Sequence, residues 1–112
     1  MAFVSLHSPE ELSNVIERSA REPVVLFKHS RTCGLSASAY REMERLTAPD
    51  DPPVYLVVVQ TARGLSDEIE ARLAIRHESP QVIVLSEAQP VFHTSHRGVT
   101  AEAVREASRT TA

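Results

Sequence analysis

The sequence predicts an α/β fold in which helices cover both faces of one mixed β-sheet. Two predicted buried strands, residues 24–28 with an apolar run over 24–27 and residues 54–59, are each followed by a segment with helical signals. This alternation requires parallel pairing, because the chain must cross over the sheet between the two strands. A third strand then leads through a short polar turn into a fourth, which adds an antiparallel hairpin. The predicted order is α-β-α-β-α-β-β-α, with a four-stranded mixed sheet.

The first helix is predicted from its start signal. Ser8 stands at the N-cap, Pro9 at the first helical position and Glu11 three residues after the cap, which together form a capping box. The buried side of this helix carries Leu12, Val15, Ile16 and Ala20. Pro23 ends the segment, and the run 24–28 that follows is short and β-branched, as in a buried strand.

The second helix follows Cys33 and is amphipathic to about Leu46. Its inner face is predicted from apolar residues spaced four, four and three apart, namely Leu35, Ala39, Met43 and Leu46. Residues 48–53 form a loop rich in proline and aspartate. The strand 54–59 is apolar throughout, which suits a central strand buried on both faces. Ser66 is the expected N-cap of a short third helix.

The C-terminal part supplies the hairpin and the last helix. A strand over residues 81–85 follows Pro80, and the polar turn 86–89 folds it back onto residues 91–93. Thr100 is the expected cap of the final helix. The inner side of that helix carries Ala103, Val104 and Ala107.

Composition places the chain of 112 residues among ordinary globular proteins, with 42% hydrophobic and 24% charged residues. A formal net charge of −3 argues against a nucleic-acid-binding face. No apolar run approaches the ~18 residues of a membrane span, and we expect no secretory signal, because no basic segment precedes an apolar core near the first residue. With one cysteine and no internal linker, we expect a cytoplasmic protein with one domain over residues 1–112, frayed at 108–112. Neither nucleic acid nor membrane is an expected partner, and the oligomeric state stays open.

The only cysteine, Cys33, stands between the first core strand and the helix that follows it. In the thioredoxin-like fold, which has this element order, the active cysteine occupies the same place. Unpaired amide groups and the positive end of the helix dipole meet there and favour an anion. We therefore expect Cys33 to be an accessible, nucleophilic thiolate. The alternative is a small buried hydrophobic residue, as many lone cysteines are.

Ser36 stands where dithiol oxidoreductases of this fold carry a second cysteine. A hydroxyl does not attack sulfur, so a mixed disulfide at Cys33 has to be resolved by an external thiol. Two interpretations of Ser36 stay open: it donates a hydrogen bond to the thiolate, or it is a small polar residue at the start of the helix.

Four short blocks carry a family resemblance: T-C-G-L-S at 32–36, V-V-Q at 58–60, H-E-S-P-Q at 77–81 and H-T-S-H at 93–96. In this order and at this spacing they resemble the YtxJ-type monothiol bacilliredoxins, and the likeness runs from about residue 24 to residue 104. The resemblance implies a thioredoxin-like fold and a cysteine that removes bacillithiol from S-thiolated proteins. It implies no bound cofactor, with bacillithiol as co-substrate. Gly34 departs from the family, which commonly has proline there.

The predicted site has Cys33 as the catalytic nucleophile. The substrate-binding residues around it are Thr32, Gly34, Ser36, Ser79 and Pro80. Ser79-Pro80 stands where the fold places a cis-proline opposite the cysteine, and the peptide before that proline is expected to offer backbone hydrogen bonds to an extended substrate. A trans-proline that starts an edge strand is the alternative.

Charged residues and histidines near this site have open roles. Lys28, Arg31 and Arg41 either attract an anionic small thiol or are ordinary solvated charges. His29 and His77 either lie near the thiolate and stabilise it or are structural histidines, and the roles of His93 and His96 are unassigned. A zinc site is not expected, because a single thiolate with scattered histidines does not supply four ligands.

Two further functions remain open. C-G-L-S at 33–36 is one residue from the C-G-F-S signature of monothiol glutaredoxins, which bind a [2Fe–2S] cluster between two subunits with glutathione. Those proteins hold glutathione with a glycine pair followed by aspartate, whereas residues 96–100 here read H-R-G-V-T. The other possibility is a thioredoxin-fold adaptor whose cysteine is incidental. An absorbance spectrum of anaerobically purified protein tests the first, and failure of Cys33 to react with disulfides would favour the second.

Overall fold

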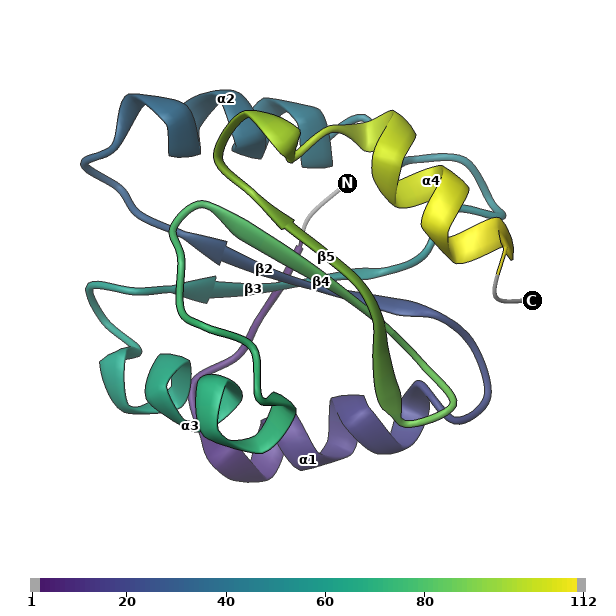
Figure 1. The fold of residues 1–112 in the computed structure, drawn as a ribbon, viewed down its shortest axis with the longest axis horizontal. Helices are drawn as coiled ribbons and strands as arrows, with labels where there is room; N and C mark the ends of the chain where they lie inside the picture. Colours follow the sequence, from purple (N-terminus) through teal and green to yellow (C-terminus); the bar gives the residue numbers. More distant parts are fainter. Residues whose placement is uncertain (1–2, 111–112) are drawn as a thin grey trace.

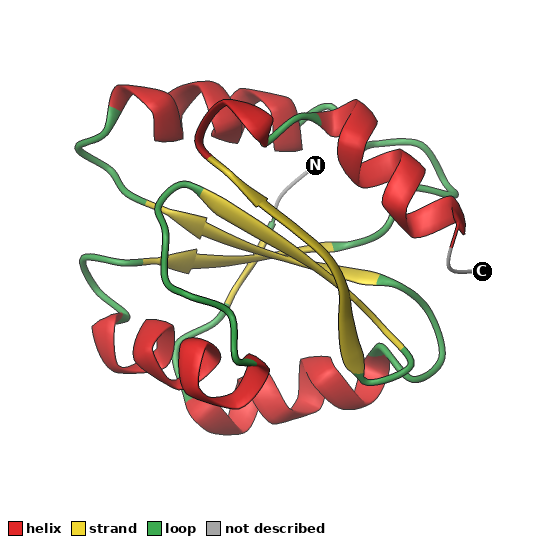
Figure 2. Ribbon diagram, viewed as in Figure 1, coloured by secondary structure: helices red, strands yellow, loops and turns green. Residues whose placement is uncertain are grey.

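The computed structural model describes residues 3–110. The elements follow in the order β1 (Val4–Ser5), α1 (Pro9–Arg18), β2 (Val24–His29), α2 (Gly34–Met43), β3 (Val54–Val58), α3 (Arg63–Leu73), β4 (Gln81–Ser86), β5 (Gln89–Ser95), a 3-10 turn η1 (His96–Gly98) and α4 (Ala101–Thr110). Helices lie on both sides of one central sheet (Figure 2). The predicted α/β class is confirmed. No helix of the described part is both long and apolar enough to cross a membrane.

The sheet has the strand order β1-β3-β2-β4-β5. β1, β3 and β2 are parallel neighbours, whereas β4 is antiparallel to both β2 and β5. α1 and α3 cover one face, and α2 and α4 cover the other (Figure 1). The prediction of four strands is corrected to five, because Val4 and Ser5 pair with β3. A strand of two residues is too short to leave a recognisable periodicity.

The side chains of β2 alternate between two hydrophobic cores. Leu26 packs among residues of α1 and α3, whereas Phe27 packs among residues of α2 and α4. Both side chains are fully buried. Because successive residues of a strand point to opposite faces, Lys28 lies on the α1 and α3 side of the sheet and His29 on the α2 and α4 side. The last two residues of β2, just before the loop that carries Cys33, therefore lie on opposite faces of the sheet.

The predicted caps of the first and last helices are confirmed. The Ser8 hydroxyl accepts a hydrogen bond from the Glu11 amide at 3.2 Å, and the Glu11 carboxylate accepts one from the His7 amide at 2.7 Å. At the start of α4, the Thr100 hydroxyl accepts from the Ala103 amide at 3.1 Å. These bonds satisfy amide groups that have no partner inside the helix.

The prediction that Ser66 caps the third helix was wrong. α3 begins four residues earlier than that cap implies, at Arg63, with Ala62 at the N-cap and no side-chain capping bond. Ala62 and Leu65 are both buried, so the inner face of the helix already exists upstream of Ser66. Ser66 lies within the helix, and its hydroxyl is 3.1 Å from Nδ1 of His77.

Two helices also differ at their ends from the prediction. α2 turns Ser36 into the core, whereas Leu35, predicted on the inner face, is only partly buried. α4 extends through Thr110, and residues 111 and 112 lie outside the described part. Ala107 packs into the core beneath the helix, and the fraying at 108–112 stays a prediction.

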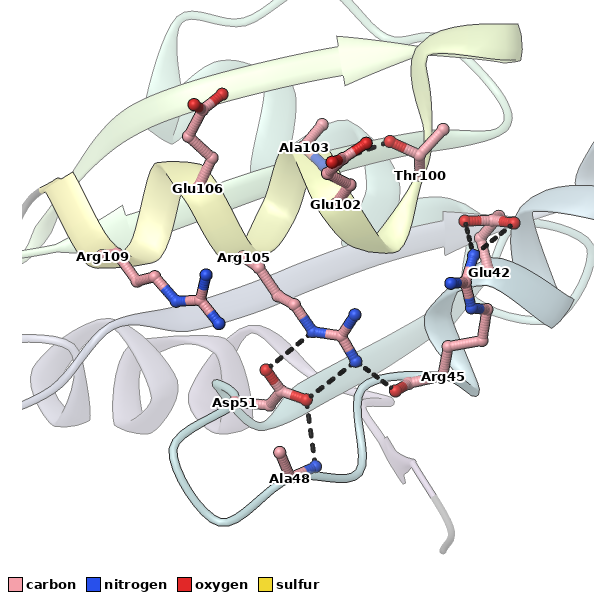
Figure 3. Close-up of a pocket in the computed structure, with 10 residues that line it drawn as sticks. All are labelled: Glu42, Arg45, Ala48, Asp51, Thr100, Glu102, Ala103, Arg105, Glu106 and Arg109. Atoms are coloured by element: carbon pink, nitrogen blue, oxygen red, sulfur yellow. Dashed lines mark hydrogen bonds and ion pairs between the residues drawn. The ribbon is translucent and has the colours of Figure 1, made fainter.

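An ion pair fixes α4 to the loop that follows α2 (Figure 3). Arg105 donates to both carboxylate oxygens of Asp51, at 3.1 and 3.3 Å, and to the carbonyl of Arg45 at 2.6 Å. The Asp51 carboxylate also accepts from the Ala48 amide at 3.0 Å, and its side chain is only 3% exposed. These bonds border a cavity of about 1150 Å³. Two of the charged groups that line it, those of Arg105 and Asp51, already bind each other.

We expect Asp51→Asn to lower the free energy of unfolding at pH 7 by about 1–3 kcal/mol, because charge-assisted bonds to a buried carboxylate are lost. Burial alone would raise the pKa of Asp51, but the bonds from Arg105 and Ala48 lower it overall. The stabilisation is therefore fully present above the ordinary carboxyl pKa and is lost as pH falls through the lower folded-state value. Denaturant titrations at pH values from 7 to 3 should show that the difference in free energy of unfolding between the wild type and Asp51→Asn becomes smaller at the acid end.

Glu22→Gln is the matched control for this prediction. Glu22 pairs with Arg18 at 3.1 Å, but the two side chains are 49% and 45% exposed. An exposed pair of this kind contributes about 0.5 kcal/mol or less. If Asp51→Asn and Glu22→Gln lower the free energy of unfolding equally, the Asp51 carboxylate has no special structural role.

Candidate functional site around Cys33

Cys33 is the N-cap residue of α2, with extended backbone angles of φ −104° and ψ 126°. Its carbonyl accepts the first helical bond, from the Ala37 amide at 3.2 Å, and its side chain makes no capping hydrogen bond. The thiol is free and partly exposed. The predicted placement at a strand-to-helix junction is confirmed, and the alternative of a buried hydrophobic residue does not fit this exposure.

Ser36 binds the loop that precedes Cys33. Its side chain is fully buried, and its hydroxyl accepts a hydrogen bond from the Ser30 amide at 3.1 Å. Neither interpretation from the sequence describes this contact, which links the first turn of α2 to the end of β2. Ser36 is thus a structural support of the cysteine loop, placed one helical turn after the thiol.

Gln60, which follows β3, holds the same loop from the other side. Its carbonyl oxygen accepts from the Arg31 amide at 3.2 Å, and its Nε2 donates to the Ser30 hydroxyl at 2.8 Å. Nε2 also lies 3.4 Å from the hydroxyl of Thr32. Gln60 is thus a functional residue to which the sequence motifs gave no role. A signal was present, since the ends of parallel strands meet at one edge of a sheet and Gln60 is the first polar residue after the predicted strand 54–59.

We expect Gln60→Ala to loosen the cysteine loop. Loss of one neutral hydrogen bond of about 1 kcal/mol corresponds to roughly fivefold faster exchange of the Arg31 amide. Hydrogen exchange followed by NMR measures this directly, and the Val25 amide, bonded to the Pro53 carbonyl at 3.0 Å, is the internal reference. Unchanged exchange at Arg31 would show that Gln60 does not hold the loop.

A cavity of about 290 Å³ opens beside the thiol. It is lined by His29, Ser30, Arg31, Cys33, Ala37, Tyr40 and Arg41. The rings of His29 and Tyr40, both part of this lining, lie 5.0 Å apart between centroids. Burial lowers the pKa of His29, against an opposing effect of the Ser36 backbone. The imidazole is therefore neutral at pH 7, and the positive charge of the cavity comes from the arginines.

The predicted site residues fall into two groups. Thr32, Gly34 and Ser36 surround Cys33 within one loop and helix turn. Ser79 and Pro80 precede β4, and the register that pairs Gln81 with Lys28 places them at the same sheet edge as the cysteine loop. The Ser79-Pro80 peptide is cis, as expected. Neither residue lines the cavity beside Cys33. The Ser79 hydroxyl is buried without a hydrogen-bond partner in the described part of the chain.

Lys28 does not belong to this cavity. The side chain is fully buried, with Nζ 3.2 Å from Nδ1 of His77 and 3.5 Å from the Ser66 carbonyl. Burial lowers the pKa of the Lys28 amine, against the opposing charges of Glu70 and Asp67. Attraction of an anionic thiol by Lys28, one of two possibilities from the sequence, does not fit a side chain buried on the far face of the sheet.

The other histidines also lie apart from the thiol cavity. His77 is bound within the cluster around Lys28. His96 lies 3.8 Å from a carboxylate oxygen of Glu78, and His93 is exposed on β5 opposite Ile83. In the described part of the chain, no three histidine, cysteine or acidic side chains gather in a way that could hold a metal ion.

Comparison with solved structures supports the class that this fold and this cysteine indicate. A candidate oxidoreductase with a thioredoxin fold is 31% identical, with a TM-score of 0.84 over 93% of this chain and 91% of that one. Thioredoxins of Malassezia sympodialis and Fasciola hepatica superpose with a TM-score of 0.75 at 16% and 15% identity. They cover 98% of this chain, and 90% and 100% of their own lengths. At such identities they establish the fold alone.

The molecule is thus a thiol oxidoreductase of the thioredoxin fold. Within that class, residues 4–104 match the family described as monothiol bacilliredoxin BrxC, and the chain belongs to this family. The resemblance seen in the sequence blocks is therefore confirmed.

Proposed function

We propose that this protein removes bacillithiol from S-thiolated proteins through a mixed disulfide at Cys33. The observation that carries the proposal is an accessible thiol at the start of α2 with a buried hydroxyl, that of Ser36, one turn further on. The chain contains no other cysteine. Family membership supports bacillithiol as the small thiol.

The chemistry is a pair of thiol–disulfide exchanges. The Cys33 thiolate attacks the bacillithiol sulfur of the modified protein, a new S–S bond forms, and the electron pair of the old bond leaves with the protein as its thiolate. Cys33 then carries bacillithiol. A second bacillithiol thiolate attacks this disulfide, which returns Cys33 to its thiolate form and releases bacillithiol disulfide. No other oxidant or reductant is required for the balance.

The remaining residues receive positioning roles in this proposal. Thr32 and Gly34 flank Cys33 in the chain, and Ser36 and Gln60 keep its loop in place. The backbone before Pro80, at the same sheet edge, is proposed to pair with an extended segment of the protein substrate. The partners are then S-thiolated proteins and a low-molecular-weight thiol, in the cytoplasm.

Intact-mass analysis tests the proposal. The reduced protein is incubated with an S-bacillithiolated protein, and in parallel with bacillithiol disulfide and glutathione disulfide. We expect one bacillithiol to be gained by this protein and lost by the substrate, with slower uptake of glutathione. Absence of bacillithiol transfer from a thiolated protein, while small disulfides still react, would refute de-thiolation as the function.

A further inference from the structure

The cavity beside Cys33 carries positive charge without a compensating carboxylate. Among its lining residues the permanently charged side chains are Arg31 and Arg41, and no aspartate or glutamate takes part in the lining. The protein as a whole has a formal net charge of −3. The charge at the thiol is therefore opposite in sign to that of the molecule.

These two arginines also differ from those that serve as structural ion pairs. Arginines bound to carboxylates in the described part of the chain are Arg18, Arg45, Arg72 and Arg105. Arg31 and Arg41 have no carboxylate within ion-pair distance there, and both are exposed. The Arg41 side chain makes one bond, from Nη2 to the Ser38 hydroxyl at 3.4 Å. Most guanidinium donors beside the thiol are thus available to a ligand.

We infer that Arg31 and Arg41 form a carboxylate-binding subsite that selects anionic small thiols for exchange at Cys33. A guanidinium group offers a planar fork of donors that matches a carboxylate, and the His29 and Tyr40 rings cover the apolar part of the ligand. The cavity, at about 290 Å³, has the size of the smallest ligand sites, which suits the small-thiol half of a mixed disulfide. This inference rests on the proposed function and specifies its substrate class.

The subsite acts on the exchange step without changing its balance. The Cys33 thiolate still forms one S–S bond while one breaks, and the electron pair leaves with the departing sulfur. The arginines hold the carboxylate of the half that becomes attached to Cys33. The arginines contribute to binding and orientation. Their effect should therefore appear as a preference between two disulfides of similar size that differ in charge.

A pair of near-isosteric disulfides measures this preference: dithiodipropionic acid, which is a dianion at pH 7, and its neutral diamide. The rate of adduct formation on Cys33 is measured for each by intact mass, and the acid-to-amide ratio is the readout. Because the intrinsic difference in leaving groups is the same for every variant, it cancels when ratios are compared. We expect Arg31→Gln and Arg41→Gln each to lower the ratio roughly threefold and the double variant about tenfold.

Arg21→Gln is the control, because Arg21 is also an exposed arginine but lies after α1, outside the cavity lining. It changes the net charge by the same amount and should leave the ratio unchanged. A ratio that falls equally in Arg21→Gln and Arg41→Gln would reduce the effect to overall charge and overturn the subsite. An unchanged ratio in the double variant would overturn it as well.

A second arm separates the source of the carboxylate. Peptides with one cysteine joined to a neutral thiol, flanked by either glutamate or glutamine, are offered to the same variants. We expect no arginine-dependent preference between these peptides, and a preference would assign the subsite to the protein substrate instead of the small thiol. If the acid-to-amide preference holds but bacillithiol is not removed from a thiolated protein, the subsite stands and the proposed function falls. If bacillithiol is removed but the acid-to-amide preference does not depend on the arginines, the proposed function stands and the subsite is overturned.

Discussion

Replacing Cys33 by serine is expected to abolish adduct formation with every disulfide. The hydroxyl is of similar size, but it is not ionised near neutral pH and does not attack sulfur. The chain has no second thiol that could substitute. Intact-mass analysis after incubation with bacillithiol disulfide should show only unmodified Cys33→Ser protein, whereas the wild type gains one small thiol.

The fold of Cys33→Ser should be retained, because the thiol makes no side-chain capping bond that the substitution would remove. Serine is itself a favoured N-cap residue, so thermal stability should be unchanged or slightly higher. An adduct on Cys33→Ser would show that some other group reacts, and the monothiol mechanism would then be wrong.

The fold could be predicted because its signals are local and agree with one another. Buried strands, caps and the turn at 86–89 each appear as short patterns, and the turn is realised with Glu87 and Ala88 at positive φ of 56° and 65°. The features that escaped prediction depend on tertiary contacts. The strand Val4–Ser5 exists only because the edge of β3 accepts it.

The candidate site was predictable at its centre and less so around it. Cys33 was located by the strand-to-helix junction alone, and the structure confirms that position. The contacts of Gln60 require the orientation of an amide relative to a loop 29 residues away in sequence, which no local pattern encodes. The burial of Lys28 was missed for a related reason, since a lysine at a strand end is normally solvated. Here the ring of His77 and a helix carbonyl surround its amine.

Ser36→Cys is expected to convert the protein from a monothiol into a dithiol oxidoreductase. Position 36 lies three residues after the N-cap Cys33, and its side chain is fully buried. Residues three apart at the start of a helix are neighbours, so we expect the introduced sulfur to reach the Cys33 disulfide. The introduced thiolate attacks the Cys33 sulfur of the mixed disulfide, so the small thiol leaves with the electron pair and an internal disulfide remains. The adduct seen with the wild type should therefore be replaced by a species lighter than the reduced variant by two hydrogen atoms.

Ser38→Cys is the matched control, since it adds a thiol to the same helix at an exposed position. That thiol faces solvent instead of the Cys33 sulfur, so the Cys33 adduct should persist in this variant. Loss of the bond from the Ser30 amide costs Ser36→Cys about 1 kcal/mol, which leaves the fold intact. A Cys33 adduct that persists equally in both variants would mean that the first turn of α2 does not present position 36 to the disulfide. In that case the absence of a second cysteine would not be what makes this protein depend on an external thiol.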